Sequence, residues 1–239
     1  MTQRLIIQNK LILTALCLIW ASAFPASADD ILQELDAQQL ASVRSGEAVL
    51  KIVDVKGESW PVVTLYQKFD ASPEECVAVF GNCESHKDFF PHLNQSVITQ
   101  IEAPHILEVE YSVSLPFLPN QTYTLRSSLN DYNEGSSFVA DWKLVKSGAL
   151  KTTQGSARFE PFEGGTLVAY QNFVVPKSSF ALMFKKQALE QVQNAFHAFR
   201  ERVIFQKNHA PAILEQEILG IKKVLEDSLE HRSCKNVLS

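Results

Sequence analysis

The chain has 239 residues, of which 46% are hydrophobic and 21% are charged; this globular composition excludes a disordered, collagen-like or disulfide-scaffold protein and a membrane protein with many spans. The net charge is -5, and the 22 lysines and arginines are spread along the chain instead of gathered in a run, which argues against nucleic acid as a partner. No Gly/Ser/Pro-rich linker divides the sequence, which predicts one compact domain.

Residues 1–28 read as a signal peptide. Arg4 and Lys10 supply a positive start, residues 11–24 are apolar, and Ala26-Ser27-Ala28 is an A-x-A cleavage site. A single membrane anchor is the alternative, but the apolar stretch of about 14 residues is shorter than the roughly 20 that span a bilayer. The sequence therefore predicts export, to the periplasm or secreted, after cleavage near Ala28.

An exported chain meets an oxidising compartment, so its cysteines could form a disulfide. Cys76 and Cys83 can pair if the helix that contains Cys76 ends at Gly81-Asn82; on one continuous helix they would lie about 10 Å apart and could not bond. Two buried free thiols are the alternative.

The first elements after the signal are a helix and a hairpin. Residues 30–43 carry leucines and an isoleucine at near-helical spacing behind two acids, which predicts a short amphipathic helix. Residues 47–55 and 61–70 are rich in β-branched and aromatic residues and flank the turn at residues 56–58. This pattern predicts two antiparallel strands.

The sharpest local signal is Ser72-Pro73-Glu74-Glu75, in which a Ser N-cap, a Pro at the first helical position and a Glu at the third form a capping box. The helix is expected to run to about Phe80. A second short helical piece is expected from Glu84 to Phe90, before Pro91 ends it.

From residue 95 to 175 the hydrophobicity alternates with period two between turn signals, which predicts an antiparallel meander. One face is apolar, and Glu108, Glu110 and Arg126 fall on the other face, where their expected role is solubility. The orientation of Arg158 stays open.

A long helix is expected from residue 178 or 179 to about 205, because apolar residues recur there every three or four positions. Pro211 interrupts the pattern. Residues 213–229 predict a second, more polar helix, and the last ten residues are expected to fray.

This order of elements resembles the START-like (SRPBCC) superfamily, which includes polyketide cyclases/dehydrases, lipid-transport domains and coenzyme Q-binding proteins. The stretches that carry the likeness are residues 63–77, the aromatic-then-Pro corner at 87–93, and the hairpin of residues 154–170. Ser156 and Ala157 depart from the pattern, because many relatives have an aromatic residue there. The implied organisation is a signal peptide at 1–28, an N-terminal helical extension at 29–46, a START-like domain at 47–206 and a C-terminal helical extension at 207–239.

The resemblance implies an α+β helix-grip fold, in which a curved antiparallel sheet wraps around the long C-terminal helix and leaves a cavity for an apolar ligand. Aromatic residues suit the walls of such a cavity. The alternative for each of them is plain core packing. The candidate ligand-binding residues are Tyr111, Tyr123, Phe138, Trp142, Phe159, Tyr170, Phe184 and Phe199.

The leading hypothesis is a protein that binds a hydrophobic small molecule or lipid, without catalysis, metal or cofactor. A cyclase/dehydrase that uses Tyr111, Tyr170 or Arg158 is the alternative, and an interaction protein with a filled cavity is a third reading. No G-x-S-x-G elbow is present. The H-x-D-x-x-x-H pattern that starts at His86 is broken by Pro91 and points to a loop rim more than to zinc. Residues 115–119 could form a pocket lip or touch a membrane transiently.

Overall fold

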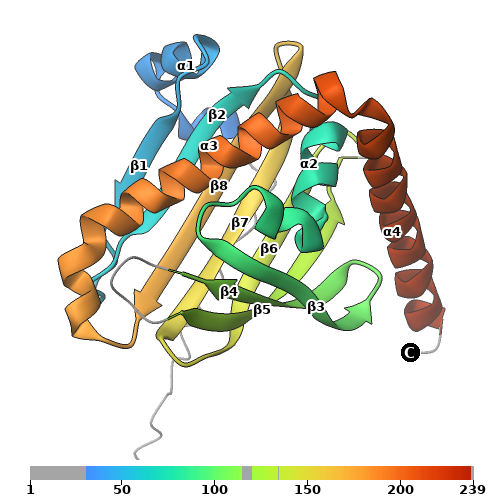
Figure 1. The fold of residues 1–239 in the computed structure, drawn as a ribbon. Helices are drawn as coiled ribbons and strands as arrows, with labels where there is room; N and C mark the ends of the chain where they lie inside the picture. Colours follow the sequence, from blue (N-terminus) through green and yellow to red (C-terminus); the bar gives the residue numbers. More distant parts are fainter. Residues whose placement is uncertain (1–30, 115–119, 134, 238–239) are drawn as a thin grey trace, which may run out of the picture.

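The computed structural model describes residues 31–114, 120–133 and 135–237, so the predicted signal peptide and the segment 115–119 lie outside the described residues. One antiparallel sheet, crossed by a long helix, dominates the molecule (Figure 1). The elements in chain order are η1 (Ile31–Glu34), α1 (Ala37–Arg44), β1 (Val49–Val53), β2 (Val62–Phe69), α2 (Pro73–Gly81), η2 (Cys83–Asp88), β3 (Leu93–Ala103), β4 (Ile106–Val113), β5 (Gln121–Asp131), β6 (Phe138–Ser147), β7 (Leu150–Phe162), β8 (Gly165–Pro176), η3 (Ser179–Phe184), α3 (Lys185–His209) and α4 (Pro211–Val237).

The sheet has eight strands in the order β1-β2-β8-β7-β6-β5-β4-β3. Strands β3 to β8 form the predicted meander, and the hairpin of β1 and β2 joins it through antiparallel pairing of β2 with β8, as in Leu65 opposite Tyr170. In Figure 1 the sheet curves, and α3 crosses the face that it encloses. This architecture confirms the α+β helix-grip fold.

The inner face of the sheet, which is the face toward α3, carries the main hydrophobic core. Residues of β2, β5, β6, β7 and β8 reach it, among them Phe69 of β2, Phe159 of β7 and Val168 of β8. Helix α2 packs on the same core, and its predicted capping box is present, with Ser72 as the N-cap and Glu75 at the third position. Helix α4 runs beside α2 at the edge of this layer (Figure 1).

The outer face of the sheet carries a second core, covered by the N-terminal segment. Ile31, Leu35 and Val43 pack there against Tyr66 of β2 and Leu167 of β8. The single helix predicted over residues 30–43 is therefore wrong in detail: it is divided into η1 and α1. Asp36 causes the break, because its side chain accepts a hydrogen bond from the Gln39 backbone N–H at 2.8 Å and starts a new helix.

Three expectations for the C-terminal part also need correction. The helical segment over residues 179–209 begins as the 3-10 helix η3 and becomes α-helical only at Lys185. Pro211 does not merely end the long helix, since it is the first residue of α4, where a proline costs no hydrogen bond. The α4 backbone is helical to Val237, so the expected fraying is wrong up to that residue; residues 238–239 lie outside the described residues.

Cys76 lies in α2 and Cys83 in η2, and both are buried free thiols. Of the two possibilities that the sequence left open, two buried free thiols are therefore the one found for Cys76 and Cys83. Within the described ranges, the helices are too short or too polar to cross a bilayer.

Candidate functional site

A group of aromatic rings fills the space between α3 and the inner face of the sheet. Phe199 of α3 lies 5.4 Å from Phe69 and 5.4 Å from Phe80, measured between ring centroids. One turn earlier, Phe196 lies 6.1 Å from Tyr170, which stacks on Trp142 at 5.2 Å. These contacts anchor the C-terminal half of α3 to the sheet.

The structure gathers most of the candidate ligand-binding residues on the inner face. Phe138, Phe159 and Phe199 are buried in the main core, and Trp142 and Tyr170 are partly buried against it. The remaining members of the set are Tyr111 and Tyr123, which lie in an adjoining cluster with a centroid separation of 5.6 Å, and Phe184, which ends η3 as a half-buried residue.

A hollow of about 260 Å³ opens between α3 and the β1–β2 side of the sheet. Leu65 and Phe196 form its apolar base, and both belong to the main core. The other lining residues are Ala48, Gln67, Gln193, Asn194 and His197. Its lining contains none of the eight candidates, although Phe196 is in ring contact with Tyr170.

The lining of this hollow was missed at the sequence level. One signal was present: strand parity places Gln67 between Leu65 and Phe69 on the inner face of β2, and a glutamine between two core residues indicates a place where the core reaches solvent. Apart from Phe196, the α3 residues of the lining are polar positions beside the apolar stripe. Nothing in the sequence distinguishes them from an ordinary solvated face.

The inner face beneath α3 also carries neutral polar groups. The Asn172 side-chain oxygen lies 3.4 Å from the Trp142 indole nitrogen and 3.5 Å from the Thr153 hydroxyl, both of which are donors. Burial raises the pKa of Tyr170 and raises the pKa of Tyr123 to about 12, so both phenols stay protonated and uncharged at neutral pH. This surface can accept apolar groups and can form hydrogen bonds with neutral polar atoms.

No protein-family model matches the chain, and no curated protein matches it significantly. Several solved structures are similar to it. A STAR-related lipid transfer protein from Xanthomonas axonopodis is similar with a TM-score of 0.59 at 13% identity, over 65% of this chain and 93% of that chain. The Zhui aromatase/cyclase from Streptomyces sp. R1128 gives 0.54 at 13% identity, over 62% and 96% of the two chains. Human STARD10 gives 0.52 at 15% identity, over 74% and 85%.

The fold is START-like. This finding confirms the START-like fold that the sequence resemblance implied. Identities of 13–15% define the fold and leave the ligand and activity of this chain to be proposed from its own residues.

His86 is not an accessible ligand in this START-like chain, because it is buried among the rings of Phe80, Phe89, Phe90 and Tyr111. Its Nε2 donates to the Phe80 carbonyl oxygen at 2.8 Å, which leaves Nδ1 facing the Tyr111 hydroxyl at 3.4 Å. Burial lowers the pKa of His86 to about 4, so the ring is neutral at pH 7.

The other members of the H-x-D-x-x-x-H pattern, Asp88 and His92, are exposed and do not join His86. Across the part of the chain that the structure describes, no group of three His, Cys, Asp or Glu side chains could hold a metal ion. The pattern therefore forms part of a structural corner between η2 and β3.

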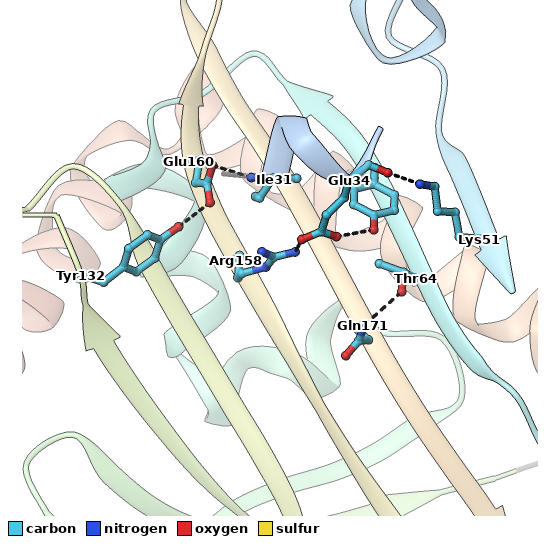
Figure 2. Close-up of polar contacts among 9 residues, drawn as sticks. Ile31, Glu34, Lys51, Thr64, Tyr132, Arg158, Glu160 and Gln171 are labelled. Atoms are coloured by element: carbon cyan, nitrogen blue, oxygen red, sulfur yellow. Dashed lines mark hydrogen bonds and ion pairs between the residues drawn. The ribbon is translucent and has the colours of Figure 1, made fainter. Parts of the chain in front are cut away.

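Arg158 lies on the outer face of the START-like sheet, away from α3 (Figure 2). Its guanidinium is paired with the Glu34 carboxylate, which also accepts a hydrogen bond from the Tyr66 hydroxyl at 2.6 Å. Next to it on β7, Glu160 accepts from the Tyr132 hydroxyl at 2.8 Å and from the Ile31 backbone N–H at 3.2 Å. Arg158 therefore holds the N-terminal segment on the sheet and cannot position a carbonyl in a cavity under α3.

This outer-face network yields a stability prediction. Glu34→Ala removes the acceptor of both Arg158 and Tyr66, and it is expected to lower the free energy of unfolding by about 1–2 kcal/mol, since hydrogen bonds to charged groups are stronger than neutral ones. Urea unfolding measures the difference. Lys151→Ala is the control, because it breaks an ion pair with Glu58 in which the lysine is 60% exposed, and it should cost less than about 0.5 kcal/mol. Equal losses in the two variants would show that the network does not anchor the segment.

Proposed function

We propose that the protein is exported and binds a hydrophobic small molecule or lipid between the inner face of the sheet and α3. The observation that carries this proposal is the hollow of about 260 Å³, whose apolar base is formed by Leu65 and Phe196 and which adjoins the aromatic rings of the main core. The START-like fold supports it, because two of the similar structures are named as a lipid transfer protein and as STARD10. Ligand pockets combine apolar walls with polar groups that orient the ligand. In this hollow Ala48, Leu65 and Phe196 are apolar, and the other four lining residues are polar.

The lining of the hollow suggests how such a ligand would lie. Leu65 and Phe196 sit at the base, and the amides of Gln67, Gln193 and Asn194 lie among the remaining lining residues. An apolar tail would therefore point toward the core, and a polar end would stay at the amides. Burial of apolar surface at about 25 cal/mol per Å² gives on the order of 7 kcal/mol for roughly 300 Å² of ligand surface, before the entropic costs of binding.

The test begins with the protein purified after expression of the full chain. Organic extraction and mass spectrometry identify any bound lipid, and titration with a fluorescent fatty-acid probe measures affinity. The proposal expects a bound hydrophobic compound or saturable probe uptake, and a mature N-terminus at Asp29 in the intact mass. Absence of both lipid and probe uptake would remove the binding proposal; an N-terminus at Met1 would remove only the export.

A pair of identical substitutions on α3 locates the site. Asn194→Trp places a large side chain in the hollow without replacing a core residue, and it should weaken probe binding at least about tenfold, which is a free-energy change of about 1.4 kcal/mol. Asn208→Trp is the control: it is the same change on an exposed residue of the same helix, about 21 Å further along at 1.5 Å per residue. If both variants bind the probe as the unmodified protein does, the ligand does not enter through this hollow.

A further inference from the structure

One end of the molecule combines exposed apolar side chains with lysines. Three segments meet there: the turn between β6 and β7, the end of β8, and η3. Lys177 joins the first two, because its backbone N–H donates to the Ala149 carbonyl at 2.8 Å and its ammonium group donates to the Ser147 carbonyl at 2.7 Å. The loop between β1 and β2 lies beside them, with the Lys185 ammonium 3.5 Å from the Ser59 carbonyl oxygen. We call this surface the η3 end.

Apolar side chains are exposed at the η3 end. Met183 is 71% exposed and Leu182 is 39% exposed, both in η3, while Val145 near the end of β6 is also exposed. Transfer of these apolar side chains out of water would be favourable. Adjacent large apolar side chains that face water therefore indicate a surface that binds a partner.

The charge at the η3 end is opposite to that of the whole chain, whose net charge is -5. The lysines there outnumber the carboxylates, and the described ion pairs engage only two of them, Lys151 with Glu58 at 2.8 Å and Lys186 with Glu190 at 3.9 Å. The lysines are Lys56, Lys146, Lys151, Lys177, Lys185 and Lys186, and the carboxylates are Asp54, Glu58 and Glu190.

From this juxtaposition we infer that the η3 end binds the surface of an anionic membrane. Leu182 and Met183 enter the boundary between headgroups and acyl chains, and the surrounding ammonium groups lie at the level of the lipid phosphates. Each lysine near an anionic surface contributes about 1 kcal/mol, and the inserted apolar area adds to it. An acidic protein would satisfy the lysines but not the exposed apolar pair, so a lipid surface fits both features. The inference is independent of the ligand proposal, because it uses none of the residues that line the hollow.

Vesicle sedimentation tests this inference with the full mature protein. Vesicles of phosphatidylcholine alone are compared with vesicles that contain phosphatidylcholine and phosphatidylglycerol in equal amounts. The expected result is sedimentation with the anionic vesicles only, reduced by added salt because mobile ions screen the lysines. No sedimentation with anionic vesicles, or equal sedimentation with both kinds, would overturn the inference.

Two variants and their matched controls assign the binding surface. Lys185→Glu with Lys186→Glu, and separately Met183→Ser, should each reduce the bound fraction, the charge reversal at least about tenfold in affinity. The controls make comparable changes elsewhere: Lys87→Glu with Lys223→Glu on exposed positions of η2 and α4, and Leu219→Ser, which also replaces a large exposed apolar side chain, on a 60% exposed position of α4. Binding retained by the η3-end variants, or lost equally in the controls, would show that net charge or another surface is responsible.

Discussion

Phe159→Ala is expected to lower the free energy of unfolding by about 3–5 kcal/mol, as truncation of a buried phenylalanine does in other proteins. The Phe159 side chain is 0% exposed and lies at the centre of the main core. Its ring centroid is 5.6 Å from that of Phe80 in α2 and 6.3 Å from that of Phe199 in α3. Since the sheet, α2 and α3 meet at this side chain, the surroundings have little freedom to close over the cavity left behind.

Urea unfolding followed by circular dichroism measures this loss. Phe205→Ala is the control, because Phe205 is on the same helix as Phe199 but is 52% exposed and stacks on His209 at 5.1 Å. The control should cost less than about 1 kcal/mol. A loss of similar size in both variants would mean that the aromatic layer under α3 does not hold the helix on the sheet.

The stability of the protein is expected to fall by about 2 kcal/mol between pH 7.5 and pH 5 because of His86 alone. Burial lowers the pKa of this residue from 6.5 to about 4. Between these two pH values the histidine is protonated in the unfolded state and neutral in the folded state, so a fall in pH favours unfolding. The contribution of the neutral His86 to the free energy of unfolding is fully present above pH 6.5. It is lost progressively as the pH falls from 6.5 to 4 and does not change further below that range.

His86→Gln removes the titration and keeps a side-chain N–H that can donate to the Phe80 carbonyl oxygen, the partner of the histidine at 2.8 Å. Unfolding free energies of the two proteins are compared at pH 7.5 and pH 5. The variant should be less stable at pH 7.5 but should show a pH-dependent loss smaller by about 2 kcal/mol. An unchanged loss in His86→Gln would place the titrating group elsewhere.

Local patterns predicted most of the fold correctly. The alternation in β4, where Val109 and Tyr111 are buried toward the core, identified both the strand and its inner face, because successive side chains of a strand point to opposite faces. The capping box at Ser72 located the start of α2 because its hydrogen bonds lie within four consecutive residues. Each of these signals depends only on neighbours in the sequence.

What the sequence left open or missed depends on geometry that the local pattern does not contain. Phe184 belongs to the apolar stripe only if the helix is regular, and the 3-10 geometry of η3, with about three residues per turn, changes the direction of its side chains. The orientation of Arg158 depends on Glu34, 124 residues earlier, and the hollow forms where Leu65 of β2 meets Phe196 of α3. Strand parity assigns a face, but it does not say which parts of a face are covered.

The covering of the outer face by residues 31–44 bears on how the protein can be handled in the laboratory. The Ile31 side chain is fully buried and its backbone N–H donates to the Glu160 carboxylate, so Ile31 is a packed position on the outer face of the sheet. A purification tag or fluorescent fusion joined close to Ile31 would disturb the packing of residues 31–44 on the outer face of the sheet. A long, hydrophilic spacer is therefore needed at that junction if the tagged protein is to keep the native arrangement.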